Sequence, residues 1–304
     1  MTETYFLGAN TRDGLRLLYD GFPPDDRARL HILKGGPGTG KSGFLRRIGK
    51  AAEERGLDVH YVLCSGDPGS LDGVYLPALR EAWADGTAPH VLEPRIYGAL
   101  GDYVHIGAFC RPDFTAEERD RLEALTKAYR ACYGRAYREL AACGDLEGWR
   151  FDAPRDGDAR ARISSLGQRA AVVGRLTRRW ISAVSCAGLI RLRGELEGLE
   201  EIPVSAPALQ ELAQDALQKG YAAIACLSPI DAERWEALLL PEAGLALTVF
   251  ARPGDAVTPA LDRALEALRQ AKSLHDALEA VYRPHMDFAA LDAFTEAQLR
   301  RIFP

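Results

Sequence analysis

Long apolar runs are missing from this chain of 304 residues. No stretch approaches the roughly 18 consecutive apolar residues of a membrane span, and Met1 to Tyr5 lack the pattern of a signal peptide. A basic excess is missing as well, because the formal net charge is −5. Such a charge argues against a general nucleic-acid binder or a protein that adsorbs to membrane surfaces. We therefore expect a cytoplasmic protein without a membrane span, and nucleic acid is not an expected partner.

Paired cysteines are missing too. The six cysteines are scattered, no two form a C-x-x-C pair, and no histidine stands at metal-ligand spacing. This argues against a zinc site or a disulfide framework and predicts reduced, mostly buried thiols. The apolar fraction of 47% is typical of a globular protein with a real core, so wholesale disorder is not expected.

The most informative stretch that is present is Gly35–Ser42. Its sequence, Gly-Gly-Pro-Gly-Thr-Gly-Lys-Ser, fits G-x-x-x-x-G-K-[ST], the pattern of a loop that wraps nucleotide phosphates. The mostly apolar run 30–33 predicts a buried strand, and residues 43–55 carry apolar side chains spaced as one face of a helix that ends at Gly56. Strand, loop and helix in this order are the context that the motif requires. The alternative is a glycine-rich turn that carries Lys-Ser by coincidence.

Each residue type in this loop suits phosphate binding. Glycines allow backbone N–H groups to turn toward a β-phosphate, and the N-terminus of the following helix favours negative charge. Lys41 is expected to reach the β- and γ-phosphates, and the Ser42 hydroxyl to coordinate Mg²⁺. The predicted cofactors are therefore ATP, or another nucleoside triphosphate, and Mg²⁺. The predicted cofactor-binding residues are Gly35, Gly36, Pro37, Gly38, Thr39, Gly40, Lys41 and Ser42.

Two aspartates after the loop are candidates for catalysis. Asp67 follows an expected strand at 59–64, and a strand–helix–strand unit of this length predicts a parallel crossover. Asp67 would then lie at the carboxyl edge near the phosphates, where it could accept a proton from a substrate hydroxyl or serve only as a turn former. Asp72 is expected to cap a helix that begins near Gly73, with orientation of a water molecule as the alternative.

A third acid, Asp85, follows the stretch 81–84, which could be a strand or the end of a helix. An acid at the end of a strand holds Mg²⁺ through water in phosphate-loop enzymes. The predicted catalytic residues are Lys41, Asp85, Asp67 and Asp72, and the predicted metal-binding residues are Ser42 and Asp85. His90 could contact phosphate or substrate, or it could only fix its own loop.

Longer periodic stretches predict helices. Thr115 to Glu118 form a capping box, and a long amphipathic helix follows up to Gly144. Residues 159–179 predict a helix rich in arginine, which could supply a cation to transition-state charge or pair with acids elsewhere. Further helices are predicted at 14–20, 258–283 and 289–302.

The second half of the chain repeats the order of the first. The predicted helix 206–219 parallels the helix after Lys41, and strands are predicted after it at 221–226 and 245–250. Residues 203–208, which precede and begin that helix, contain no glycine and no lysine. The second copy is therefore expected to have the scaffold without the anion cradle.

These patterns predict an α/β fold. The first domain, 1–165, is expected to contain a parallel sheet of the P-loop NTPase type with helices on both faces and a helical extension at 115–165. The second domain, 166–304, is expected to be a degenerate repeat that lacks the phosphate loop and ends in helices.

Three motifs in order, Ile32–Ser42, Ser70–Val74 and Asp85–Val91, resemble a poorly characterised bacterial family of tandem phosphate-loop ATPases. Members carry two such halves, each followed by helices, and a C-terminal stretch similar to 271–276 and 286–288. The resemblance spans nearly the whole chain. It implies the fold and a nucleotide cofactor without an established substrate, and it makes Asp85 the first choice for the Mg²⁺-linked acid.

The chain departs from that family pattern in two places. Members usually keep a phosphate loop in both halves, and the second loop is absent here, which removes a two-site mechanism within one chain. The stretch 81–84 is also less apolar than in the family. We therefore expect an ATPase or an ATP-dependent phosphotransferase with a single active nucleotide site. The alternative is a nucleotide-gated binding or assembly module with little or no turnover, and the sequence names neither a small-molecule substrate, nor a protein partner, nor an oligomeric state.

Overall fold

The computed structural model describes residues 2–144, 148–169 and 172–304. The chain forms two compact units, and each is assembled from separated stretches of sequence. Unit 1 comprises the first four residues, Phe22–Arg135 and Glu266–Pro304, and unit 2 comprises Tyr5–Gly21 and Ala136–Leu265. The predicted domains have a single boundary, after residue 165, whereas the chain passes between the two observed units at several points. That domain assignment stays a prediction.

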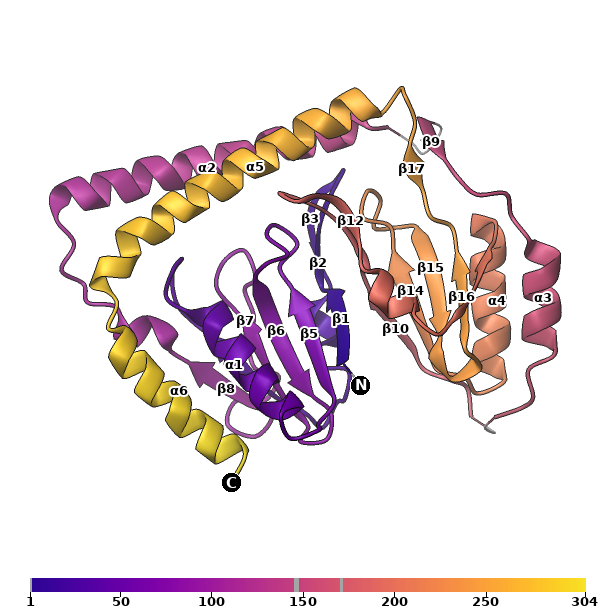
Figure 1. Ribbon diagram of the computed structural model, residues 1–304, viewed down its shortest axis with the longest axis horizontal. Coiled ribbons are helices and arrows are strands. Elements are labelled where there is room, and N and C mark those ends of the chain that lie inside the picture. Colours follow the sequence, from indigo (N-terminus) through magenta and orange to yellow (C-terminus); the bar gives the residue numbers. More distant parts are fainter. Residues whose placement is uncertain (1, 145–147, 170–171) are drawn as a thin grey trace. The chain divides into compact units, whose positions relative to one another are not determined.

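A mixed sheet forms the centre of unit 1 (Figure 1), with the strand order β1-β5-β6-β7-β4-β8. Its strands are β1 (Thr2–Phe6), β4 (Arg29–Leu33), β5 (Val59–Leu63), β6 (Leu71–Leu76), β7 (Glu81–Asp85) and β8 (Gly101–Val104). Strand β4 pairs in parallel with β7 and β8, while β6 runs antiparallel to both β5 and β7. The α/β class is therefore present, but the sheet is mixed, where a parallel one was predicted.

The predicted parallel arrangement of the two strands on either side of α1 (Lys41–Glu53), β4 and β5, is present. Two antiparallel steps separate β5 from β7, and β7 is parallel to β4, so β5 and β4 run the same way. The two strands are not neighbours, because β6 and β7 lie between them in the sheet. Their common direction places the carboxyl ends of β4, β5 and β7 at one edge.

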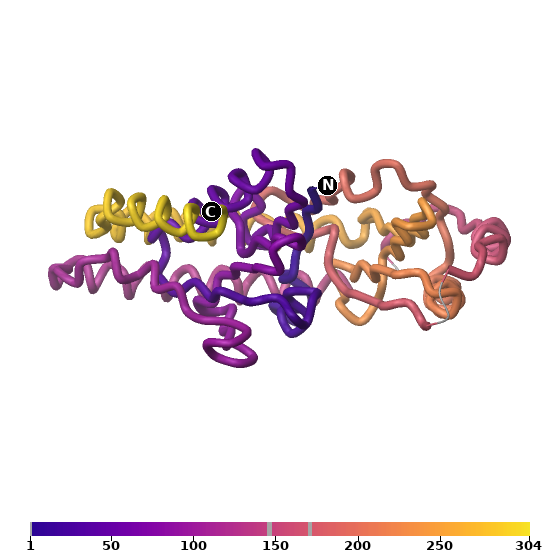
Figure 2. Tube along the Cα trace, turned by 90° about the horizontal axis from the view of Figure 1, so that it is seen from below, coloured from indigo at the N-terminus to yellow at the C-terminus, as the bar shows by residue number. Residues whose placement is uncertain are grey.

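Helix α1 (Lys41–Glu53) packs on this sheet through one apolar face. Phe44, Leu45 and Ile48 are at most 2% exposed, and burial of each such side chain contributes about 1.5–3 kcal/mol. Gly56, with φ of 71°, takes the left-handed conformation that commonly ends a helix. Helix α6 (Phe288–Ile302) packs beside α1 (Figure 1, Figure 2), with the rings of Phe294 and Phe44 stacked at 6.1 Å between centroids.

The sheet of unit 2 has the order β10-β14-β15-β16-β13. Its strands are β10 (Leu176–Arg179), β13 (Glu200–Pro203), β14 (Ala223–Leu227), β15 (Trp235–Leu240) and β16 (Leu245–Thr248). Helices α3 (Asp156–Ser164) and α4 (Ala206–Gln218) pack together on it, and the buried side chains of α4 join one core cluster with those of the sheet. Unit 2 also contains two hairpins, β2 (Gly8–Thr11) with β3 (Gly14–Leu17) and β11 (Ser182–Ser185) with β12 (Gly188–Arg191), and a short pair formed by β9 (Trp149–Arg150) and β17 (Arg252–Pro253).

The two sheets share a strand order. When β10, β14, β15, β16 and β13 are matched in turn with β1, β5, β6, β7 and β4, the antiparallel and parallel pairings agree wherever both are described. Even a register shift recurs, between Val62 and Leu63 in β5 and between Cys226 and Leu227 in β14. A duplication of the chain would produce such a likeness, but strand order alone does not establish one, so the repeat stays a prediction.

Long helices follow the predicted ranges. Helix α2 covers Ala116–Ala142, and α5 covers Thr258–Tyr282. The capping box at the start of α2 is present: the Thr115 N–H donates to Glu118 Oε2 at 2.8 Å, and the Glu118 N–H donates to Thr115 Oγ1 at 3.2 Å. None of the helices in the described residues is long and apolar enough to span a membrane.

Two predicted helices are wrong. Residues 14–20 form strand β3 and a short 3-10 turn, because Gly14, with φ of 97°, closes a tight turn back onto β2. Among the described residues of the stretch 159–179, the α-helix is α3, which ends at Ser164, and the last residues form β10. Gly174 lies between them, where a Cβ would stand 1.8 Å from the carbonyl oxygen of Tyr221, so the chain there passes too close to another backbone for a helix.

Candidate functional site

Unit 1 contains a cavity of about 470 Å³ at the carboxyl edge of its sheet. Residues 37–43 of the glycine-rich loop and the start of α1 line one side, and residues that follow β5 and β7 line another. Side chains from α2 and α5 complete the lining. The predicted site residues Lys41, Ser42, Asp67, Asp72 and Asp85 all line this cavity.

The glycines of the loop are required by its conformation. Gly38 and Gly40 have φ of 68° and 92°, a region that side chains with a Cβ rarely adopt. A Cβ on Gly40 would lie 2.8 Å from Leu291 Cδ2 of α6, and one on Gly38 would lie 3.0 Å from the Cα of Glu279 in α5. The loop is therefore closely packed by these two helices.

Lys41 is held against the loop itself. Its Nζ donates to the carbonyl oxygens of Gly35 and Gly36, both at 2.8 Å, and lies 3.6 Å from Asp85 Oδ2. The side chains of Lys41 and Asp85 are only 11% and 16% exposed, so the attraction between them is less screened than at the surface. The strand alternative for residues 81–84 is confirmed, and Asp85 lies opposite Leu33 in the β4–β7 register.

Thr87 joins Asp85 to the loop. Its N–H donates to Asp85 Oδ1 at 2.8 Å, and its hydroxyl donates to the carbonyl oxygen of Gly35 at the same distance. Sequence reasoning missed this residue. The spacing Asp-x-Thr is typical of an Asx turn, which could have indicated the first of these bonds but not the second.

The predicted role of Asp72 as a helix cap is wrong. Residues 71–76 form β6, which is buried along its whole length, and Asp72 is 6% exposed. Its Oδ2 lies 3.5 Å from Nε2 of His90. Burial raises the pKa of Asp72 to about 6, although the nearby His90 acts in the opposite direction. Asp72 is therefore a buried carboxyl that titrates near neutral pH.

Ser42 and Asp67 have local partners. The Ser42 hydroxyl accepts the Leu71 N–H at 2.9 Å. Asp67 Oδ1 accepts the Gly69 N–H at 3.1 Å, which is the turn-forming bond anticipated as an alternative, and its Oδ2 lies 3.5 Å from Nζ of Lys272. Asp67 thus both forms the turn and lines the cavity.

The side of the cavity formed by α2 and α5 was not predicted. Tyr129 and Tyr133 of α2 form a T-shaped pair with centroids 5.1 Å apart, and the ring of His275 lies 5.7 Å from Tyr129. Lys272 of α5 and Arg283, which follows α5, add positive charge. The apolar periodicity of α2 places its tyrosines on a buried face, but it carries no information about which cavity that face meets.

Four arginines of 159–179 pair with acids, which is the alternative named for this stretch. The ion pairs described within unit 2 join Arg160 with Glu211, Arg162 with Glu200, Arg169 with Glu242 and Arg179 with Glu195.

The donor set around the loop suits Mg²⁺ and phosphate. In the part of the chain that the structure describes, no three His, Cys, Asp or Glu side chains are placed to hold a metal ion. Ser42 and Asp85 offer oxygen atoms, which Mg²⁺ prefers, and this ion usually takes its remaining ligands from water and phosphate. The first four N–H groups of a helix lack partners within the helix, and the residues that begin α1 line the cavity.

Comparisons with known proteins add no assignment. No family model matches the chain, and neither a curated protein nor a solved structure shows significant similarity to it. The resemblance to tandem phosphate-loop ATPases therefore rests on the motifs alone and stays an expectation.

Proposed function

We propose that unit 1 binds a magnesium nucleoside triphosphate, ATP by expectation, and acts as an ATPase or an ATP-dependent phosphotransferase with one active site. The observation that carries this proposal is the convergence of the glycine-rich loop, Lys41, Ser42 and Asp85 on one cavity at the N-terminus of α1. The volume of about 470 Å³ falls in the range of small-molecule sites.

The loop would bind the phosphates through its backbone. The N-terminus of α1 carries partial positive charge and unpaired N–H donors, and the positive φ angles of Gly38 and Gly40 give the backbone the turns that such a cradle needs. Glu279 and Leu291 lie so close to Gly38 and Gly40 that a Cβ on either glycine would meet them, which leaves the loop little room to move. Less conformational entropy is then lost on binding.

Lys41 would neutralise phosphate charge. An ammonium group has three donors, and two of them are used by the carbonyl oxygens of Gly35 and Gly36. These bonds hold the side chain at the loop, and Asp85 attracts it from the other side. A phosphate oxygen would compete with Asp85 for the ammonium and leave that carboxylate available.

Ser42 and Asp85 would hold Mg²⁺ from two adjoining elements, the first turn of α1 and the end of β7. When bound, the ion would neutralise charge that develops on the phosphoryl oxygens. Thr87 would keep the Asp85 carboxylate oriented through its N–H.

Asp72 is the proposed base. Its pKa of about 6 lies near the pH at which a general base is most effective, and His90 is close enough to stabilise the carboxylate. Asp72 would accept a proton from the attacking water in hydrolysis or from a substrate hydroxyl in transfer. Asp67 is tied to Gly69 and lies near Lys272, so it suits a binding role better.

The decisive experiment combines calorimetry with Mg·ATP and a phosphate-release assay. Lys41→Ala is expected to abolish binding, because it removes the cation nearest the loop. Lys50→Ala is the matched control, since Lys50 lies in the same helix with its side chain 74% exposed, and it should bind as the wild type does. Unchanged affinity in Lys41→Ala would show that the site assignment is wrong.

Phosphate release separates the remaining possibilities. Release from ATP without other additions indicates an ATPase, and ADP formation that depends on one component of a metabolite pool indicates a phosphotransferase. Binding without either product would favour the nucleotide-gated module instead.

A further inference from the structure

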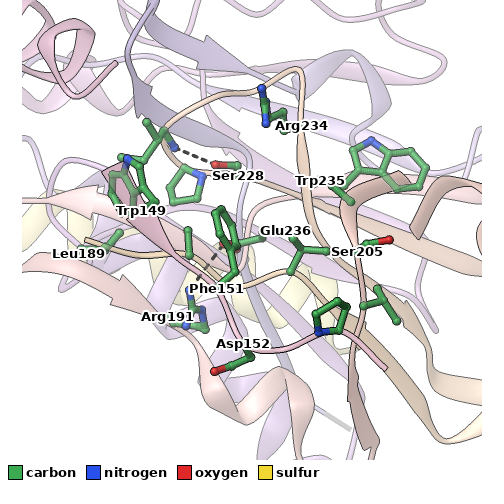
Figure 3. Close-up of a pocket in the computed structure, with 17 residues that line it drawn as sticks. Trp149, Phe151, Asp152, Leu189, Arg191, Ser205, Ser228, Arg234, Trp235 and Glu236 are labelled. Atoms are coloured by element: carbon green, nitrogen blue, oxygen red, sulfur yellow. Dashed lines mark hydrogen bonds and ion pairs between the residues drawn. The ribbon is translucent and has the colours of Figure 1, made fainter. Parts of the chain in front are cut away.

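A second cavity, of about 240 Å³, lies within unit 2 (Figure 3). The segment from β9 to the start of α3, the end of β12, the junction between β13 and α4, the connection from β14 to β15 and the end of β16 all contribute to it. Strand β13 and helix α4 hold the same places in their sheet order as β4 and α1 hold in unit 1. The cavity therefore adjoins the junction that corresponds to the glycine-rich loop.

Aromatic rings supply much of the lining. Figure 3 shows Trp149 and Phe151 near each other at the cavity, whereas the ring of Trp235, another lining residue, points away from them. Trp149 is 6% exposed, whereas Phe151 is 40% exposed. Flat rings of this kind pack well against another flat ring.

Two buried polar atoms of lining residues have no hydrogen-bond partner among the residues that the structure describes. They are Oε1 of Glu236, an acceptor, and Nε1 of Trp149, a donor. The Glu236 side chain is only 4% exposed. Buried polar groups in folded proteins are almost always satisfied, and a molecule bound here could satisfy this donor and this acceptor.

The charges around the cavity are already paired. Arg191 Nη2 lies 3.8 Å from Glu236 Oε2, its Nε donates to Ser182 Oγ at 3.2 Å, and its guanidinium lies 3.7 Å from the ring centroid of Phe250. Arg234 is 3.4 Å from Asp231, and Asp152 pairs with Arg252. An ionic ligand would lack a counter-charge here, so a neutral one fits best.

We propose that this cavity binds a small, neutral, planar nitrogen heterocycle with the chemistry of a free nucleobase. A ring N–H of the ligand donates to Glu236 Oε1, a ring nitrogen or carbonyl oxygen accepts the Trp149 indole N–H, and the ring packs against the aromatic side chains. The β13–α4 junction has no glycine and no lysine, in agreement with a ligand that carries no phosphate.

Benzimidazole is a suitable probe, because it is planar and carries one N–H donor and one ring-nitrogen acceptor. Indene has nearly the same shape and carries neither. Saturation-transfer NMR and calorimetry with the full chain should detect benzimidazole at millimolar concentration and no binding of indene. Absence of benzimidazole binding, or equal binding of indene, would overturn the proposal.

Two matched tryptophan variants test whether benzimidazole binds at the Trp149 N–H. Trp149→Phe keeps an aromatic ring but loses the N–H, and we expect affinity for benzimidazole to fall about tenfold, as for one lost hydrogen bond. Trp235→Phe makes the same change at a lining residue whose ring nitrogen is not among the buried, unsatisfied atoms, and affinity should stay within about twofold. Equal losses in both variants would contradict the assigned donor.

Glu236→Met provides a second readout that does not depend on the stability of the Trp149 variant. Methionine has a similar length and neither carboxyl oxygen, so benzimidazole affinity should again fall about tenfold. Circular dichroism confirms that each variant is folded. Unchanged affinity in a folded Glu236→Met variant would remove the acceptor from the proposed site.

Discussion

Asp85 has two contacts that a substitution can separate. Its Oδ1 accepts the Thr87 N–H, and its Oδ2 faces Lys41. Asparagine keeps an acceptor for Thr87 but removes the negative charge. In Asp85→Asn we expect Mg·ATP binding to survive and phosphate release to fall at least about tenfold, or roughly 1.4 kcal/mol of barrier. Calorimetry and steady-state phosphate release check the two parts, and normal turnover would move the metal-linked role to Asp67 or Asp72.

Asp72 makes the stability of unit 1 depend on pH in a direction unusual for an acid. Its pKa is about 6 in the folded chain, against an ordinary value of 3.8. Between these pH values the folded state binds more protons than the unfolded state. The contribution of Asp72 to the free energy of unfolding therefore decreases as pH rises. This contribution is fully present below pH 3.8 and is lost above about pH 6.

Asparagine at position 72 is uncharged at every pH and removes that dependence. Relative to the wild type, Asp72→Asn should gain up to about 3 kcal/mol in the free energy of unfolding between pH 4 and pH 7. Urea unfolding at several pH values measures this. Asp255→Asn is the control, since the Asp255 side chain is 98% exposed; parallel profiles for the two variants would contradict the burial of Asp72.

At the scale of one element, the start of α1 requires a residue without a Cβ atom at position 40. Gly40→Ala would force a residue at φ of 92° and place a Cβ 2.8 Å from Leu291. We expect a loss of about 1–3 kcal/mol in stability together with weaker Mg·ATP binding. Thermal unfolding and calorimetry measure both effects.

Gly43→Ala provides the comparison for Gly40→Ala, because Gly43 lies in the same helix and a Cβ there would have no atom within 4 Å. Alanine inside a helix is favoured over glycine by about 0.5–1 kcal/mol, so this variant should be slightly more stable than the wild type. A stable Gly40→Ala variant would show that α6 does not restrain the loop.

Helices with several turns of regularly spaced apolar residues could be predicted from the sequence. A strand whose residues are explained only by its pairing with other strands could not. Helices α4, α5 and α6 each present several turns of apolar residues, so their ranges were found closely. Strand β6 contains Asp72 and Gly73, which strands usually avoid. Gly73 is needed because a Cβ would lie 3.0 Å from the carbonyl oxygen of Trp83 in β7. Only the pairing of distant segments reveals that requirement.

The same distinction holds for the candidate site. The glycine-rich loop, Lys41 and Ser42 are consecutive in sequence, so a local pattern found them. Tyr133 and Lys272 line the same cavity, but they lie on helices far apart in the chain, and their positions follow from tertiary packing alone. Local sequence therefore predicted the side of the cavity that the glycine-rich loop forms and not the opposite side.

At the scale of the whole molecule, each unit has its own apolar core. A nucleotide that binds unit 1 should therefore protect the amides of α1 and β7 from hydrogen exchange. At a hundred times the dissociation constant, a ligand adds about 2.7 kcal/mol to the stability of what it binds. Exchange with and without Mg·ATP measures this, and protection confined to unit 2 would contradict the assignment of the nucleotide to unit 1.

The division of unit 1 into separated stretches has a consequence for synthesis. A ribosome makes the glycine-rich loop early, then all of residues 136–265 of unit 2, and only afterwards the part of α5 that carries Lys272 and His275. A nascent chain that already displays the loop still lacks one side of the cavity and the helix that packs on Gly40. The first half of the protein, released alone by a premature stop or a proteolytic cut, would carry the glycine-rich loop in full and an incomplete pocket around it.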